Sequence, residues 1–112
     1  MQAEDKIRLQ HILQEANQAI HFVKDLEYDE FSKDPKTVRA VMRCVEVIGE
    51  ASSKLSDELR ESNPQIPWRK IIGMRNRLIH VYFDIDYPII WQTVKGNLPP
   101  LIIQIQSILN KR

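Results

Sequence analysis

Apolar side chains at helical spacing run through most of this chain, and this periodicity restricts its fold more than any other feature. Between residues 35 and 60 they recur at alternating steps of three and four: Val38, Val41, Val45, Ile48, Ser52, Leu55 and Leu59. This spacing places one continuous stripe on one side of a helix. Asp34 followed by Pro35 supplies an N-cap and a favourable first helical residue. The pattern therefore predicts a long helix over residues 35–60.

The rest of the chain shows the same period and no sign of strands. No Asn-Gly or Asp-Gly turn lies between alternating apolar runs, which is the usual mark of a hairpin. Prolines and glycines interrupt the pattern at a few places. The helices expected besides 35–60 are residues 5–26, residues 68–82, a short helix capped by Asp86 that ends at Gly96-Asn97, and a last helix opened by Pro99-Pro100. We predict an all-α, antiparallel bundle of about four to five helices, with residues 1–112 as one domain.

Composition favours a cytoplasmic protein without a membrane segment. The chain has 112 residues, of which 43% are hydrophobic and 28% charged. No apolar run approaches the roughly 20 residues that a membrane span needs, and the N-terminus has no apolar stretch behind a basic start. The single cysteine, Cys44, lies in an apolar helical pattern and is expected to be a buried thiol. The helix expected over residues 5–26 carries two histidines, His11 and His21. They are ten residues apart, which is not the spacing of a metal site.

The net charge of +1 conceals two oppositely charged segments. Residues 25–34 hold five acidic side chains against one lysine, whereas residues 64–83 hold four Lys and Arg and no acidic residue before Asp84. Such segregation can steer an anion to one face and a basic partner to another. A loop that is only well solvated would look the same.

The basic segment ends in residues 75–82, Arg-Asn-Arg-Leu-Ile-His-Val-Tyr. In-line chemistry on a phosphodiester uses a cation such as Arg75 and a titratable group such as His80. The plain alternative is a helix that is solvated on one side and packed on the other. On one ideal helix Arg75 and Tyr82 share a stripe, but Arg75 and His80 lie about 140° apart. Either the helix loosens near His80, or a second molecule completes the site. We favour a two-fold dimer, in which Arg75 of one chain approaches His80 of the other.

The pattern Arg75-x4-His80-x-Tyr82 resembles the motif of HEPN-domain ribonucleases, specifically the HepT-like toxins of prokaryotic toxin–antitoxin pairs. The similarity extends to further segments: Val47-Ile-Gly-Glu-Ala51, Ile66-Pro-Trp68, Ile71-x-Gly-Met-Arg-Asn76, Asp84-Ile-Asp86, Trp91 and Leu98-Pro99. An Arg-x4-His pair alone arises often by chance. The tyrosine and the flanking segments make the likeness specific.

This resemblance implies a HEPN-like helical bundle that dimerises through the motif helix and cleaves RNA without a metal or other cofactor. Arg75 and His80 would be catalytic, and Asn76 would help to hold the site. The implied partner is a nucleotidyltransferase antitoxin, as in type VII-like systems, which transfers AMP from ATP to Tyr82. An adenylylated Tyr82 would place a phosphodiester where substrate phosphate should bind.

Other residues have weaker assignments. We expect Arg69, Lys70 and Arg77 to bind the RNA backbone collectively, and Trp68 and Trp91 to anchor the core. Glu50 either orients His80 or Arg75, or is an exposed glutamate.

Two other functions remain open at this stage. One is a non-catalytic HEPN-type module that binds RNA or nucleotide, or docks a nucleotidyltransferase. The other is a plain helical dimer whose motif is structural. The joint presence of Arg75, Asn76, His80 and Tyr82 favours the nuclease.

Overall fold

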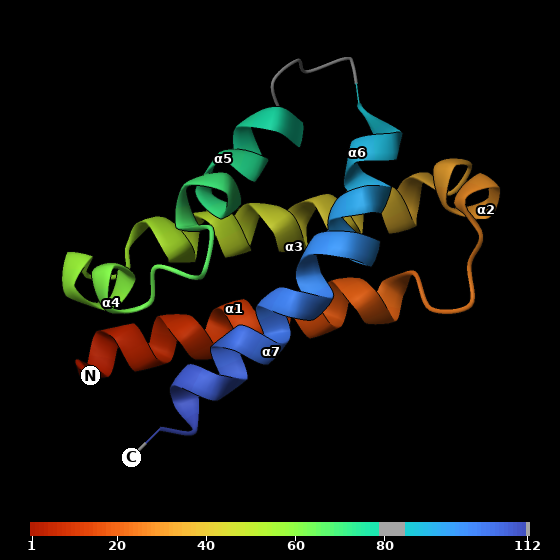
Figure 1. Ribbon diagram of the computed structural model, residues 1–112. Helices are drawn as coiled ribbons and strands as arrows, with labels where there is room; N and C mark the ends of the chain where they lie inside the picture. Colours follow the sequence, from red (N-terminus) through yellow and green to blue (C-terminus); the bar gives the residue numbers. More distant parts are fainter. Residues whose placement is uncertain (79–84, 112) are drawn as a thin grey trace.

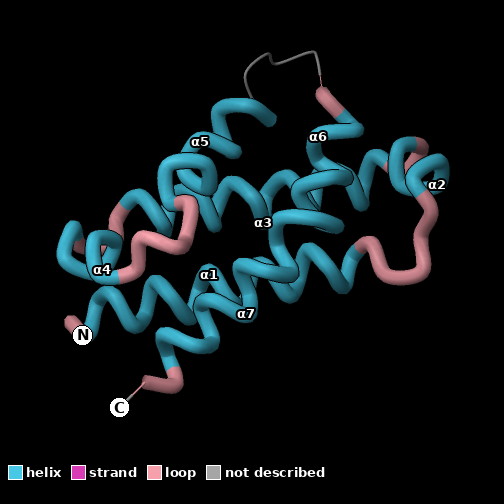
Figure 2. The backbone as a smooth tube through the Cα atoms, viewed as in Figure 1, coloured by secondary structure: helices cyan, strands magenta, loops and turns pink. Residues whose placement is uncertain are grey.

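The computed structural model describes residues 1–78 and 85–111, apart from the side chains of Arg75 and Asn76. Within these ranges every regular element is a helix (Figures 1 and 2). The helices are α1 (Ala3–Phe22), α2 (Tyr28–Ser32), α3 (Pro35–Ser53), α4 (Asp57–Ser62), α5 (Trp68–Leu78), α6 (Tyr87–Gln92), the π-helical turn η1 (Thr93–Asn97) and α7 (Leu98–Leu109). The prediction of an all-α bundle is confirmed.

The two longest helices form the base of the bundle. α1 and α3 run in opposite directions and pack along each other, as Figure 1 shows. α5 packs on α3, and α7 crosses α1. The stripe predicted on α3 faces this core, because Val38, Val41, Val45, Ile48 and Ser52 are all at most 1% exposed. Each fully buried aliphatic side chain of this kind contributes about 1.5–3 kcal/mol through its removal from water.

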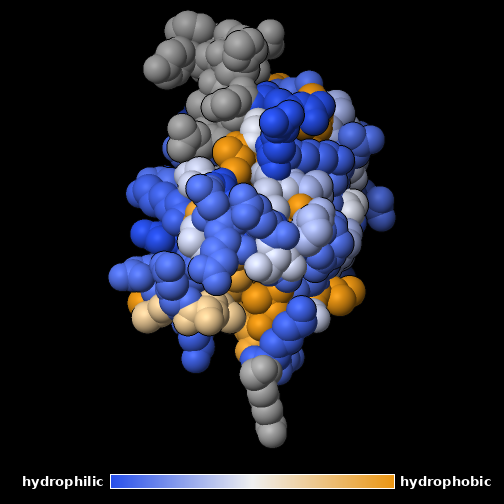
Figure 3. Space-filling model, turned by 60° about the vertical axis from the view of Figure 1, so that its left-hand side comes forward, coloured by the Kyte–Doolittle hydropathy of each residue, from blue (hydrophilic) through white to orange (hydrophobic). Residues whose placement is uncertain are grey.

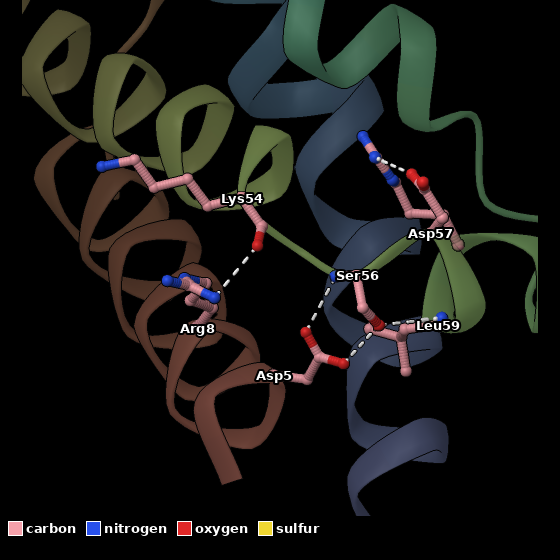
Figure 4. A network of polar contacts seen from close by, with 7 residues as sticks. Asp5, Arg8, Lys54, Ser56, Asp57 and Leu59 are labelled. Atoms are coloured by element: carbon pink, nitrogen blue, oxygen red, sulfur yellow. Dashed lines mark hydrogen bonds and ion pairs between the residues drawn. The ribbon is translucent and has the colours of Figure 1, made fainter. Parts of the chain in front are cut away.

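The prediction of one unbroken helix over residues 35–60 is wrong, because α3 ends at Ser53 and a separate helix, α4, begins at Asp57. Figure 4 shows the contacts that divide it. Ser56 caps α4 by accepting a hydrogen bond from the Leu59 N–H at 3.1 Å. Its own N–H and hydroxyl donate to the two carboxylate oxygens of Asp5, at 2.9 and 2.6 Å. Arg8 in turn donates to the Lys54 carbonyl at the end of α3, at 3.0 Å. Both partners come from α1, so the break depends on tertiary contact.

Replacing Asp5 by alanine should lower the free energy of unfolding by about 1–3 kcal/mol, since the Ser56 N–H and hydroxyl would lose their buried acceptor. Asp5 is only 2% exposed, so its carboxylate is the acceptor that the fold provides for these two donors. Urea denaturation followed by circular dichroism measures the change. Glu4→Ala, an exposed carboxylate one residue earlier, is the matched control and should stay within about 0.5 kcal/mol of wild type. Equal stability of the two variants would contradict the role given to Asp5.

The first helix is also shorter than predicted, and residues 23–26 are not helical. Asp25 adopts a left-handed backbone conformation with φ of 65°, which aspartate tolerates better than most residues. The unpredicted α2 follows it. Its start carries a reciprocal pair of caps, in which the Glu27 N–H donates to Glu30 Oε1 at 2.9 Å. α2 places Phe31, which is fully buried, against Trp91 at a ring-centroid distance of 5.2 Å. The acidic segment is therefore partly a helix with a buried aromatic residue.

The expected break at Gly96-Asn97 is a π-helical turn, so α6, η1 and α7 follow one another without a loop. The Leu98 N–H donates to the Thr93 carbonyl, five residues back. Pro99 and Pro100 come directly afterwards, where helices tolerate residues without an N–H. The predicted cap of α6 is confirmed, since Asp86 Oδ1 accepts from the Ile89 N–H at 3.1 Å.

Candidate active site

The helix that carries the start of the motif is anchored by a buried polar loop. Trp68, the first residue of α5, is 7% exposed, and its indole N–H donates to the Asn63 carbonyl at 3.1 Å. The Asn63 side chain, also buried, donates to the Leu59 carbonyl at 2.9 Å. α5 packs into the core through three buried side chains, Ile71, Met74 and Leu78. Trp68 is thus confirmed as a core anchor, and α5 leaves this loop in a fixed direction.

The motif itself falls mostly outside the described residues. The backbone of Arg75 and Asn76 belongs to α5, but their side chains lie outside the description. His80 and Tyr82, within residues 79–84, lie outside it altogether, as does the end of the helix predicted to reach residue 82. The segment is bounded by the buried Leu78 and by the half-buried Ile85. It therefore joins two helices, α5 and α6, that both pack on α3.

The outer face of α5 is cationic. Arg69, Lys70 and Arg77 are all exposed. Among the described residues, no carboxylate lies within ion-pair distance of any of the three, since the pairs found there join Arg43 to Glu46, Lys54 to Glu50 and Arg60 to Asp57. Exposed cations on one helix attract a polyanion such as a nucleic-acid backbone.

Glu50 lies half-buried on α3 and forms an ion pair with Lys54, at 3.4 Å between Oε1 and Nζ. It lines a groove of about 380 Å³ between α1 and α3, together with Arg8 and Arg43. Any contact of Glu50 with Arg75 or His80 involves side chains outside the described residues. Its role in orienting them stays a prediction.

The remaining candidates have structural roles in the described part of the chain. Burial, and then a hydrogen bond to the Glu15 carboxylate, raise the pKa of the Cys44 thiol to about 12, so this cysteine stays neutral and is no nucleophile. Trp91 is half-buried and packs edge-on against Tyr28 at 5.9 Å, with the Lys95 ammonium 4.9 Å from its ring centroid.

A larger hollow, of about 570 Å³, opens at another place on the molecule. It is lined by residues of α1, α4 and α7 and the segments beside them, among them Met1, Asp5, Leu59 and Ile108. Figure 3 views the end of the molecule at which α4 and the start of α1 lie, and its hydrophobic residues gather toward the bottom. Asp5 already accepts two hydrogen bonds from Ser56 there. The carboxylate of Asp5 is therefore already engaged by Ser56 and has a structural role in this hollow.

Neither membrane nor metal features appear in the described ranges. None of the helices there is both long and apolar enough to span a bilayer. Residues 1–78 and 85–111 contain no group of three His, Cys, Asp or Glu side chains arranged to hold a metal ion.

Comparison with known proteins places these features in a family context. A family model described as "Ribonuclease HepT-like" matches residues 12–108. A protein of Caldanaerobacter subterraneus subsp. tengcongensis, named "Putative RNase TTE0752", is 46% identical over 92% of this chain and 92% of its own length. "Putative RNase MJ1380" of Methanocaldococcus jannaschii is 41% identical, with 92% and 94% covered. "Probable ribonuclease HepT" of Thermococcus cleftensis is 37% identical, with 90% and 92% covered. No solved structure matches the chain significantly.

Proposed function

Because the chain belongs to the HepT-like ribonuclease family, we propose that it is a metal-independent endoribonuclease. In this proposal it is the toxin of a type VII-like toxin–antitoxin pair. The observation that carries the proposal is the family match over residues 12–108, which includes the whole motif. The cationic outer face of α5 supports an RNA substrate, because Arg69, Lys70 and Arg77 are exposed beside the motif.

The motif residues suit cleavage by the 2′-hydroxyl of the RNA itself. His80 accepts the proton of the 2′-hydroxyl, whose oxygen attacks the neighbouring phosphorus. The bond from phosphorus to the 5′-oxygen breaks, that oxygen takes up a proton, and a 2′,3′-cyclic phosphate remains. Arg75 stabilises the charge that develops on the phosphate oxygens, and Asn76 holds the site. Each step is an acid–base or electrostatic one, so no metal is needed.

A homodimer is part of the proposal, for a geometric reason. Arg75 and His80 lie about 140° apart on an ideal helix, so one rigid helix does not direct both to one phosphate. Two chains related by a two-fold axis bring the Arg of one near the His of the other, and place two imidazoles in the same cleft. The apolar side chains Ile71, Met74 and Leu78 are buried within their own bundle, so they do not supply the contact between the two chains.

Regulation completes the proposal. A nucleotidyltransferase antitoxin transfers AMP from ATP to the Tyr82 hydroxyl, with release of pyrophosphate. Tyr82 shares its helical stripe with Arg75 when the helix is continued to residue 82. The new phosphodiester then pairs with Arg75 and competes with the substrate phosphate.

The unmodified chain, purified without its partner, should cleave single-stranded RNA in the presence of EDTA. Gel analysis of labelled fragments, with and without treatment by a cyclic phosphodiesterase, measures the cleavage and the expected cyclic phosphate. Loss of all cleavage on addition of EDTA would refute the metal-free mechanism. RNA binding without any cleavage would instead support the alternative, a non-catalytic HEPN-type binding module.

A further inference from the structure

A groove of about 200 Å³ lies between α5 and the start of α7. α5 is the helix that also carries Arg75 and Asn76. Its lining combines three kinds of side chain: the buried Ile71, Met74 and Leu101; the half-buried Asn97 and Gln104; and the exposed Lys70, Pro67 and Pro100. The floor is thus apolar, while amide groups and one cation stand at the rim. A groove of this size has room for several waters or for one flat heterocycle.

Within residues 1–78 and 85–111, the two amide groups of the groove have no side-chain partner among the described side chains. The side chain of Asn97 makes no capping hydrogen bond to α7, and no hydrogen bond joins Asn97 or Gln104 to another side chain in the described part of the molecule. Each amide offers two donors and one carbonyl acceptor. Such groups pair with the edges of nucleobases, as Asn and Gln do with adenine.

Charge around the groove favours an anionic strand. The lining of the groove holds one cation, Lys70, and no Asp or Glu. Lys70 and Arg77, seven residues apart, share one stripe of α5 and lie about 10 Å from each other along its axis. That stripe runs past the groove. A neutral ligand would gain nothing from these cations.

We propose that the groove between Lys70 on α5 and Asn97 and Gln104 on α7 binds one nucleobase of the RNA substrate, while Lys70 and Arg77 hold the phosphates beside it. The inference rests on the proposed ribonuclease function and adds a specificity-determining subsite to it. The base lies on the floor of Ile71, Met74 and Leu101, and the amides pair with its edge. The groove would thereby favour certain bases at one position near the cleaved bond.

The test uses RNA binding rather than cleavage, so that it is independent of the nuclease chemistry. The ligands are short 2′-O-methyl RNA strands, which cannot be cleaved by attack of a 2′-hydroxyl. One strand is complete, and each of the others lacks the base at one position, a different position in each strand. Fluorescence anisotropy measures the dissociation constant of each strand for wild type and for Gln104→Leu. Gln106→Leu, an exposed glutamine of the same helix outside the groove, is the matched control.

For wild type, one abasic position should weaken binding about tenfold, because one base contact is lost. Gln104→Leu should weaken binding of the complete strand about fivefold to tenfold and leave the strand with that abasic position unchanged. Lys70→Gln should weaken both strands equally, as a phosphate contact would. If Gln104→Leu behaves like Gln106→Leu, or if no abasic position matters, the subsite does not exist. Failure of the proposed nuclease would appear separately, as intact binding of these strands without cleavage of ordinary RNA.

Discussion

Replacing His80 by alanine should lower the rate of RNA cleavage by about 10²- to 10⁴-fold, the range that a positioned acid or base contributes. Histidine is the usual proton acceptor and donor among the residue types of this motif. Single-turnover cleavage of labelled RNA by protein made without its partner measures the effect. His21→Ala is the matched control, because His21 is an exposed histidine at the end of α1. Equal losses in the two variants would contradict a catalytic role of His80.

A mixture of two inactive variants tests whether the site is shared. Arg75→Ala and His80→Ala chains each lack one group. In a mixed dimer, one of the two sites combines the intact Arg75 of one chain with the intact His80 of the other. Because random exchange makes half of the dimers mixed, about a quarter of wild-type activity should return after the chains are refolded together. A mixture that stays as inactive as its components would refute the shared site.

AMP transfer to Tyr82 should abolish RNA cleavage. The added phosphodiester competes for Arg75 and its adenosine fills the cleft. We expect co-expression with the cognate nucleotidyltransferase to raise the intact mass by one or more AMP units. Cleavage by this modified protein should then fall at least about 10²-fold, as far as loss of a catalytic group would take it.

Matched tyrosine variants assign the modification. Tyr82→Phe should stay unmodified and active in the presence of the partner, whereas Tyr28→Phe, altered at a half-buried tyrosine that packs on Trp91, should still be modified and silenced. An AMP adduct that persists in Tyr82→Phe would show that another residue is the acceptor. A modified protein that still cleaves RNA would show that the modification does not regulate cleavage.

The apolar period and the local capping residues were readable without the structure. The stripe on α3 faces the core as predicted, because the side of a helix that is buried depends only on residue spacing. Asp34 and Asp86 cap their helices as predicted. Thr37 donates to Asp34 through its hydroxyl at 2.7 Å and its N–H at 3.3 Å, and these bonds lower the pKa of the Asp34 carboxyl. Caps of this kind involve partners three residues away.

The errors in the prediction have a different origin. α3 ends early because Asp5 and Arg8, about 50 residues away, bind Ser56 and Lys54. α2 was not predicted, because the contact that buries it joins Phe31 to Trp91, a residue far away in the sequence. The apolar pattern alone shows no break at residue 54, since Leu55 and Leu59 continue the stripe, and both are buried although the helix is interrupted. Local spacing cannot reveal a competing hydrogen-bond partner on another helix.

The sequence by itself determined the helical class, the buried stripe of α3 and the motif that marks the family, because periodicity and residue identity are properties of the chain. Only the tertiary structure decided where α3 stops and which polar groups meet. It brings Lys70 of α5 beside Asn97 and Gln104, about 30 residues later. That meeting depends on how α5 and α7 pack against α3 and α1, and packing between distant segments leaves no signal in the local pattern.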